Sequence, residues 1–151
     1  MNIQSFQRVP DITGDDNTDT ASLQQMAKSA RDYIASFTWC PPIKATYLAS
    51  GVGAVVAIFL FKFSKKIQQA DDQLWVVVGD LPSAYLVVEE DDSPALERYC
   101  GLMEDWVAAV RDSGALSEVF PVSTEPTVEN AESLERRIAF LLAEIIPRAA
   151  R

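Results

Sequence analysis

The sequence predicts an α+β fold, in which an antiparallel sheet of about four strands is packed by three helices. Four apolar segments rich in β-branched and aromatic residues have the length of strands and lie near 43–49, 54–63, 74–79 and 84–90. Three other segments repeat their apolar residues at helical spacing and lie near 20–37, 94–113 and 127–146. The turn residues Gly79, Asp80 and Pro82 separate the last two strands, as expected in an antiparallel meander.

The length of the chain, 151 residues, fits one ordinary domain and is too short for two. Hydrophobic residues make up 48% and charged residues 23%, which is average globular usage and excludes wholesale disorder. The start of the chain is polar and carries Asp15, Asp16 and Asp19. We therefore expect a flexible acidic N-terminal arm at 1–19, a single α+β domain at 20–147 and a short tail at 148–151.

The first helix is expected over 20–37. Ser22 and Gln25 have the spacing of a capping box, in which two side chains bind the free amides at a helix start. Pro41 and Pro42 prevent the helix from continuing. One face of the helix repeats apolar residues, at Leu23, Met26, Ala27, Ala30, Ile34 and Phe37.

Residues 43–63 admit two interpretations that lead to different functions. The 17 residues from Ala45 to Phe61 are uncharged and have lysines on both sides, which is the outline of a short membrane span at 45–63. The other interpretation is a β-hairpin with its turn at the glycines of 51–53. The hairpin is favoured because 17 residues are few for a span and because the strands at 74–79 and 84–90 need partners.

The two C-terminal helices have clearer ends. Ser93 is the expected N-cap and Pro94 the first-turn residue of the helix at 94–113, which Gly114 ends. Pro147 ends the helix at 127–146. Trp106 lies on the apolar stripe of the first of these helices, so we expect it in the core.

Charge and composition exclude several functions. With 13 basic and 22 acidic residues the net charge is −9, which repels nucleic acids and anionic membrane surfaces. Without histidine, the chain has neither a Ser-His-Asp nor a Cys-His nucleophile system, and no imidazole ligand for a metal. We therefore expect no nucleic-acid partner, no cofactor and no metal, and an enzyme is the less favoured class.

The cysteines and the N-terminus predict a cytoplasmic protein. Cys40 and Cys100 are too far apart in sequence for a zinc knuckle or a redox pair, and two thiols in a chain of this length favour a reducing compartment. The first residues lack the basic start and apolar stretch of a secretory signal peptide. If 45–63 spans a membrane, the alternative is a single-pass protein located in the inner membrane.

Seven residues are candidates for an interaction surface. Trp39 stands at a helix end beside two prolines and is the tryptophan to test for exposure at an interface, although a place in the core is favoured. Four successive acids between a strand and a helix suggest either a site for a hard cation or, as we favour, a solvated turn at a helix N-terminus. Asp80 suggests a turn cap or an acid–base carboxylate, and the first is favoured. The full set is Trp39, Asp80, Tyr85, Glu89, Glu90, Asp91 and Asp92.

The segment around the last two strands carries a pattern of tryptophan, glycine-aspartate-leucine-proline and tyrosine at Trp75, Gly79, Asp80, Leu81, Pro82 and Tyr85. It resembles small bacterial proteins grouped only as domains of unknown function, in which Trp-x-x-x-Gly-Asp-Leu-Pro-x-x-Tyr recurs. The resemblance implies a soluble bacterial α+β domain and brings no activity or catalytic residue with it.

These observations favour a non-enzymatic protein-binding module, of the adaptor or immunity type, with a basic partner. The acid clusters at 15–19 and 89–92 and the net charge of −9 suggest that binding weakens steeply with salt. Two alternatives stay open: a single-pass membrane protein with its span at 45–63, and a carboxylate-based enzyme centred on Asp80 and Glu89. The sequence predicts neither the identity of the partner nor the oligomeric state.

Overall fold

The computed structural model describes residues 6–9, 11–52, 55–67, 72–88, 95–112, 114–122 and 124–145. The chain forms two compact units, Met1–Asp92 and Ser93–Arg151. The first unit holds a β-sheet and one long helix, and the second holds two long helices. The predicted α+β class is therefore confirmed, while the expectation of a single domain over 20–147 stays a prediction.

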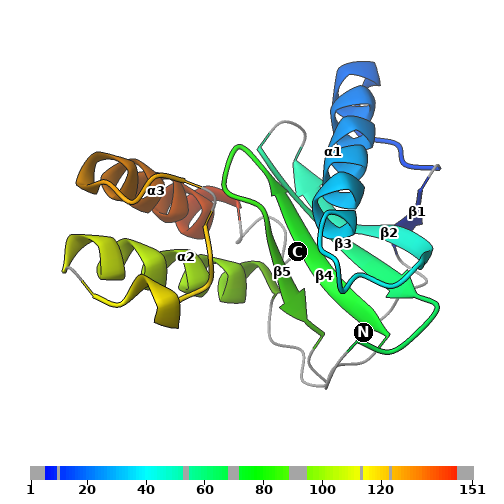
Figure 1. The fold of residues 1–151 in the computed structure, drawn as a ribbon. Coiled ribbons are helices and arrows are strands. Elements are labelled where there is room, and N and C mark those ends of the chain that lie inside the picture. Colours follow the sequence, from blue (N-terminus) through cyan, green and yellow to red (C-terminus); the bar gives the residue numbers. More distant parts are fainter. Residues whose placement is uncertain are drawn as a thin grey trace. The chain divides into compact units, whose positions relative to one another are not determined.

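The sheet of the first unit is an antiparallel meander in which each strand pairs with its neighbour in sequence, in the order β1-β2-β3-β4-β5 (Figure 1). In the described part of the chain it has five strands where the sequence predicted about four. Their bounds are Gln7–Arg8 for β1, Ile43–Val52 for β2, Val56–Phe63 for β3, Gln73–Gly79 for β4 and Ala84–Val87 for β5.

The ambiguous apolar segment forms the hairpin of β2 and β3. Ile43 pairs with Phe63 at the open end of this hairpin, and Val52 pairs with Val56 beside the turn. Phe59 and Leu60 point to opposite faces of β3, and both are buried, as expected for a strand with a continuous apolar run. Among the helices of the described ranges, none combines the length and the apolar character needed to cross a bilayer.

Helix α1, Asn17–Ala35, covers one face of this sheet (Figure 1). It begins one turn before the predicted start, so the proposed capping box at Ser22 and Gln25 is wrong. Asp16 is the N-cap, and its carboxylate accepts a hydrogen bond of 2.7 Å from the amide of Asp19. Aspartate caps a helix as well as serine does. Acidic residues in the first turn also stabilise the helix, because they interact favourably with the positive end of its dipole.

The core of the first unit lies between α1 and the sheet. Side chains of β3 and β4 that point toward α1 alternate with those that point to the other face. The buried residues of this core come from the sheet, from α1 and from the segment before it. They are Ile12, Leu23, Met26, Ala27, Ala30, Ile34, Leu48, Ala57, Phe59, Phe61, Phe63, Leu74, Val76 and Val78.

The N-terminal segment contributes more to this unit than a loose arm would. Strand β1 pairs with β2, and Ile12 is part of the core. On the face of the sheet opposite to α1, the ring of Phe6 packs edge-on against Trp75 at a centroid distance of 6.1 Å. Apolar residues at 6 and 12 therefore anchor a segment that is polar on average.

The second unit contains helices α2, Ala95–Arg111, and α3, Val128–Phe140, which lie side by side (Figure 1). The described residues of this unit also contain two short helices, η2 at Leu116–Glu118 and η3 at Leu141–Ile145. Thr127 caps α3 by accepting a hydrogen bond of 3.1 Å from the amide of Asn130. Trp106 is buried, as predicted, while the predicted cap Ser93 lies outside the described residues.

Candidate functional site

Two of the predicted interaction residues, Trp39 and Tyr85, come together in the first unit. The turn that follows α1 places Trp39, because the amide of Cys40 donates a hydrogen bond of 3.1 Å to the carbonyl oxygen of Phe37. Tyr85 lies on β5 opposite Val76, on the face of the sheet that α1 covers. The ring centroids of Trp39 and Tyr85 are 5.2 Å apart.

Four side chains, Tyr33, Phe37, Trp39 and Tyr85, form one group of rings that we call the aromatic cluster. Phe37 is its centre, since its centroid lies 5.2 Å from Tyr33, 5.1 Å from Trp39 and 5.2 Å from Tyr85. Trp39 stacks on Phe37 with an interplanar angle of 24°, while Tyr33 and Tyr85 meet Phe37 edge-on. Such offset and edge-on pairs are the favourable geometries for aromatic rings.

The cluster is partly open to solvent. Trp39 is 38% exposed, which was the less favoured of its two expected positions, whereas the other three rings are half-buried. Burial, and then the nearby Tyr85, raise the pKa of Tyr33 well above its usual range. The Tyr33 phenol therefore stays neutral even in mildly alkaline solution. The cluster contains no carboxylate, ammonium or guanidinium group of its own.

A small pocket adjoins the same side of α1. It has a volume of about 440 Å³ and is lined by Met26, Ser29, Val78, Gly79, Asp80 and Ser83. Asp80 is exposed, and its amide donates a hydrogen bond of 2.9 Å to the carbonyl oxygen of Val55. One carboxylate and two hydroxyls in this pocket suit the binding of a small polar group.

The pocket and the aromatic cluster lie on one stripe of α1. Met26, Ser29, Tyr33 and Phe37 follow one another at intervals of three or four residues, which places them on one side of the helix. The eight residues from Met26 to Tyr33 extend about 10 Å along α1, at about 1.5 Å per residue, and Phe37 follows just after the end of the helix. The structure thus brings Asp80 to the middle of α1 and Tyr85 to its C-terminal end.

The remaining predicted site residues, Glu89, Glu90, Asp91 and Asp92, lie outside the described residues. The acidic residues at 15–19 serve the start of α1, since Asp16 caps the helix and Asp19 accepts a hydrogen bond of 2.9 Å from the amide of Asp15. In the described ranges, no three of the residues that commonly bind metals form a group able to hold an ion.

Tyr33 and Phe37 were not predicted as members of an interaction surface. Phe37 was expected on the core stripe of the first helix, and Tyr33 was not singled out. The signal that could have found them is their spacing of four residues, which places two rings next to each other at the end of a helix, just before Trp39.

Both cysteines are free. Cys40 lies beside the cluster and is half-buried, and its thiol donates a hydrogen bond of 3.3 Å to the carbonyl oxygen of Pro41. Burial raises the pKa of the Cys40 thiol, which lowers its reactivity as a nucleophile.

A scan against protein-family models found no match to this chain, and searches of curated proteins and of solved structures found no significant match either.

Proposed function

We propose that the protein is a non-enzymatic protein-binding module and that the aromatic cluster is the centre of its binding surface. The observation that carries this proposal is the exposed Trp39, which stacks on Phe37 and meets Tyr85 edge-on. Tryptophan and tyrosine are enriched among the residues that supply most of the binding free energy in protein complexes.

The contacts among the rings also favour binding, because they hold Trp39 in place before a partner arrives. Trp39 is held by two ring contacts and by the turn after α1, so it loses little conformational freedom when a partner covers it. Ordering a free side chain at an interface costs about 0.5–1.5 kcal/mol. A pre-ordered ring avoids much of this cost.

The net charge of −9 favours a basic partner, because opposite charge raises the rate of encounter and like charge lowers it. We place this module in the cytoplasm of a bacterium, as an adaptor or an immunity-type protein. The two free thiols support a reducing compartment, and the Gly-Asp-Leu-Pro segment supports a relation to the small bacterial proteins that it resembles.

The test compares binding by the full-length protein and by two variants. Trp39→Ala removes the exposed ring, and Leu116→Ala is the matched control, since Leu116 is an apolar side chain 40% exposed in the second unit. Proteins that the immobilised wild type retains from the cells of origin are identified, purified and titrated by surface plasmon resonance. Because a central aromatic residue contributes about 2 kcal/mol or more, we expect about thirtyfold weaker binding for Trp39→Ala.

The loss should lie in the dissociation rate, while added salt should lower the association rate. Leu116→Ala should bind like the wild type. Equal affinity of Trp39→Ala and the wild type for every purified partner would refute the aromatic cluster as the binding centre. Affinity that does not change between 50 mM and 500 mM NaCl would refute a basic partner.

A carboxylate-based enzyme centred on Asp80 and Glu89 is the second candidate, and the polar pocket at Asp80 is the observation that favours it. The test is a thermal-shift screen of small polar metabolites against the wild type and Asp80→Asn. A compound that stabilises the wild type and not Asp80→Asn, and that is chemically converted on incubation, supports this candidate. Ser36→Ala, on an exposed serine away from the pocket, is the control.

A further inference from the structure

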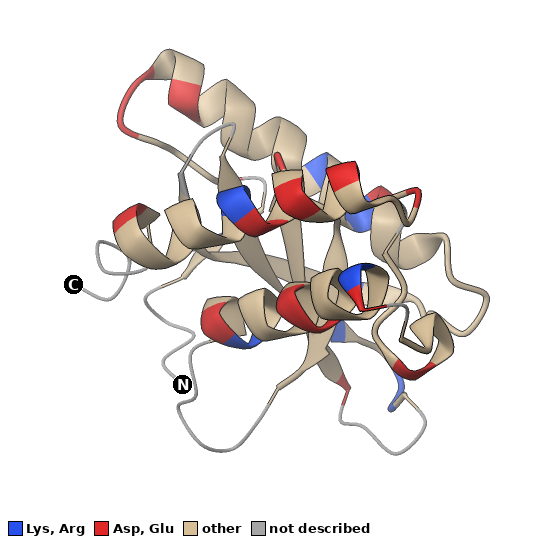
Figure 2. Cartoon of the chain, turned by 90° about the vertical axis from the view of Figure 1, so that its left-hand side faces the viewer, with Lys and Arg blue, Asp and Glu red and all other residues tan. Residues whose placement is uncertain are grey.

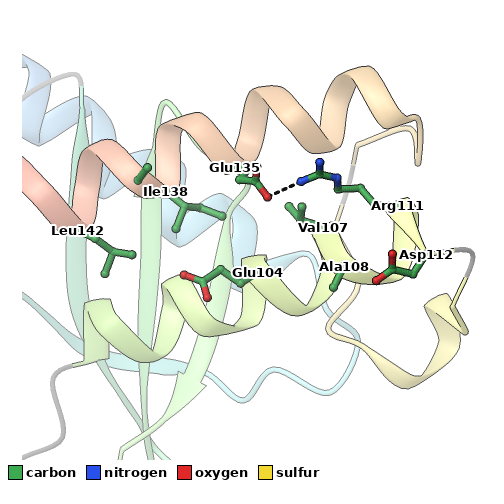
Figure 3. A pocket seen from close by; sticks show the side chains of 9 residues that line it. Glu104, Val107, Ala108, Arg111, Asp112, Glu135, Ile138 and Leu142 are labelled. Carbon is green, nitrogen blue, oxygen red and sulfur yellow. Dashed lines mark hydrogen bonds and ion pairs between the residues drawn. The ribbon is translucent and has the colours of Figure 1, made fainter.

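The second unit contains a groove that the aromatic cluster does not explain. It runs between α2 and α3 and has a volume of about 480 Å³ (Figure 3). We call it the α2–α3 groove, and it is lined by Glu104, Val107, Ala108, Arg111, Asp112, Glu135, Ile138, Ala139 and Leu142.

The floor of this groove is apolar. Val107 and Ile138 are buried between the two helices, and Leu142 is 42% exposed at one end (Figure 3). Ala108 and Ala139 are exposed, and their short side chains leave the groove open. A groove with this lining accepts apolar side chains from a partner.

The rim of the groove is acidic. Glu104, Asp112 and Glu135 contribute carboxylates, and Arg111 is the one basic residue among the nine. Arg111 forms an ion pair of 2.7 Å with Glu135, which joins α2 to α3 across the groove (Figure 3). Within the described residues no ion pair reaches Glu104 or Asp112.

The second unit as a whole is acidic, like the rim of the groove. From Ala95 to Ile145 the sequence has ten acidic and four basic residues. Figure 2 shows acidic residues along the helices, with few basic ones among them. A partner that fills the groove must therefore bring positive charge beside its apolar side chains.

We propose that the α2–α3 groove binds one basic amphipathic helix of a partner protein. From Glu104 to Arg111 the groove follows eight residues of α2, which is about 12 Å or about two helical turns. That length matches apolar anchors at positions i, i+3 or i+4, and i+7 of a bound helix. Lysine or arginine beside these anchors reaches the carboxylates of Glu104 and Asp112.

This proposal rests on residues of the second unit alone and goes beyond the proposed function. The aromatic cluster can fail as a binding centre while the groove still binds a helix, and the reverse also holds. The Trp39→Ala variant separates the two, because it leaves every residue of the groove unchanged.

The test titrates the full-length, ¹⁵N-labelled protein with a synthetic peptide, and NMR records which amides shift. The peptide carries leucine at i, i+4 and i+7 and lysine beside them, and a scrambled peptide of the same composition is the control. We expect the shifts to concentrate on residues that line the groove. The scrambled peptide should bind at least tenfold more weakly.

Variants locate the binding further. Ala108→Trp and Ala139→Trp fill the groove and should each weaken binding at least tenfold, whereas Ala21→Trp, on an exposed alanine of α1, should have no effect. Glu104→Gln combined with Asp112→Asn keeps the shape of the groove and removes two charges. It should weaken binding severalfold at 50 mM NaCl and less at 500 mM.

Several results would overturn the proposal. Equal binding of the two peptides, or equal binding by the Gln/Asn double variant and the wild type at low salt, would show that charge attraction is non-specific. Shifts concentrated on the aromatic cluster would place the peptide elsewhere. A dimer in light scattering that Ala108→Trp and Ala139→Trp dissociate would assign the groove to a second copy of this chain. If both tryptophan variants fail to fold, the Gln/Asn double variant still tests whether the groove binds the peptide.

Discussion

The aromatic cluster of the first unit and the α2–α3 groove of the second unit offer a partner different chemistry. The cluster consists of four rings without a charged group, and the groove combines an apolar floor with acidic residues on its rim. Contacts between apolar rings depend little on salt, whereas attraction between exposed charges is screened beyond about 8–10 Å at physiological ionic strength. An acidic chain can therefore carry one surface that sets the lifetime of a complex and another that sets its rate of formation.

The two units also contain phenylalanines that differ in burial. In the first unit Phe59, Phe61 and Phe63 lie on one face of β3, beneath α1. In the second unit Phe140 stands 50% exposed at the end of α3. The same residue type is thus a core element in one unit and a surface feature in the other, which can be tested directly.

The largest effect is expected for Phe59→Ala. Phe59 is fully buried, so its loss removes apolar contacts and leaves a cavity, with an expected cost of about 3–5 kcal/mol in the free energy of unfolding. Phe140→Ala is the matched control and should change stability by less than about 0.5 kcal/mol. Urea unfolding followed by circular dichroism measures both, and equal costs would contradict the packing described for β3.

A smaller but still large effect is expected for Gly79→Ala. Gly79 has a φ of 150°, and an added Cβ would overlap the carbonyl oxygen of Val55 and lie 2.8 Å from the Cα of Val56. Backbone strain and overpacking together should cost about 2–4 kcal/mol. The same unfolding experiment measures this cost.

Gly101→Ala is the counterpart in the second unit. Gly101 lies inside α2, where a Cβ would meet no atom within 4 Å, so alanine should stabilise the helix by about 0.5–1 kcal/mol. Destabilisation by both substitutions would contradict the backbone and packing described at these two glycines.

The example of Gly79 shows what the sequence could predict. Gly79, Asp80 and Pro82 predict a turn because each favours turn conformations by itself, and the turn is there. The hairpin at 43–63 and the burial of Trp106 are likewise confirmed, since both follow from local periodicity and from the need of strands for partners. The turn was predicted too early, because Gly51 belongs to β2 and pairs with Ala57.

Features that depend on contacts between distant residues were not predicted. Strand β1 is two residues long and has no periodicity to detect, and it forms only because β2 lies beside it. Trp39 and Tyr85 are 46 positions apart in the sequence, so only the packing of α1 on the sheet brings them together. The α2–α3 groove depends on which faces of two helices remain uncovered, and hydrophobic periodicity predicts the buried faces only.

The two cysteines provide a comparison of reactivity between the units. Burial, with Glu104 and Glu97 nearby, raises the pKa of Cys100 to about 11, and its side chain is buried. Below pH 11 the Cys100 thiol stays mostly protonated, so its alkylation should accelerate as the pH rises from 8 toward 11. Cys40 is half-buried, and we expect it to react at least tenfold faster with iodoacetamide at pH 8.

Mass spectrometry of the alkylated peptides measures both rates in one sample. Cys40→Ser should remove the fast reaction, and Cys100→Ser should remove the slow one. In 8 M urea the two thiols should react at similar rates, because unfolding removes the burial. Equal rates in the folded protein would contradict the difference in burial between Cys40 and Cys100.

The smallest effect is expected for the ion pair across the α2–α3 groove. The side chains of Arg111 and Glu135 are 42% and 54% exposed, and exposed pairs contribute less than about 1 kcal/mol because water and salt screen them. A double-mutant cycle with Arg111→Ala and Glu135→Ala should give a coupling energy in this range at 50 mM NaCl and close to zero at 1 M. A coupling above about 2 kcal/mol would mean that the pair holds the helices together, and a partner could then engage Glu135 only by breaking a structural contact. A small coupling leaves Glu135 able to exchange Arg111 for a basic side chain of a bound helix at little cost in stability, which is the property that an acidic docking groove needs.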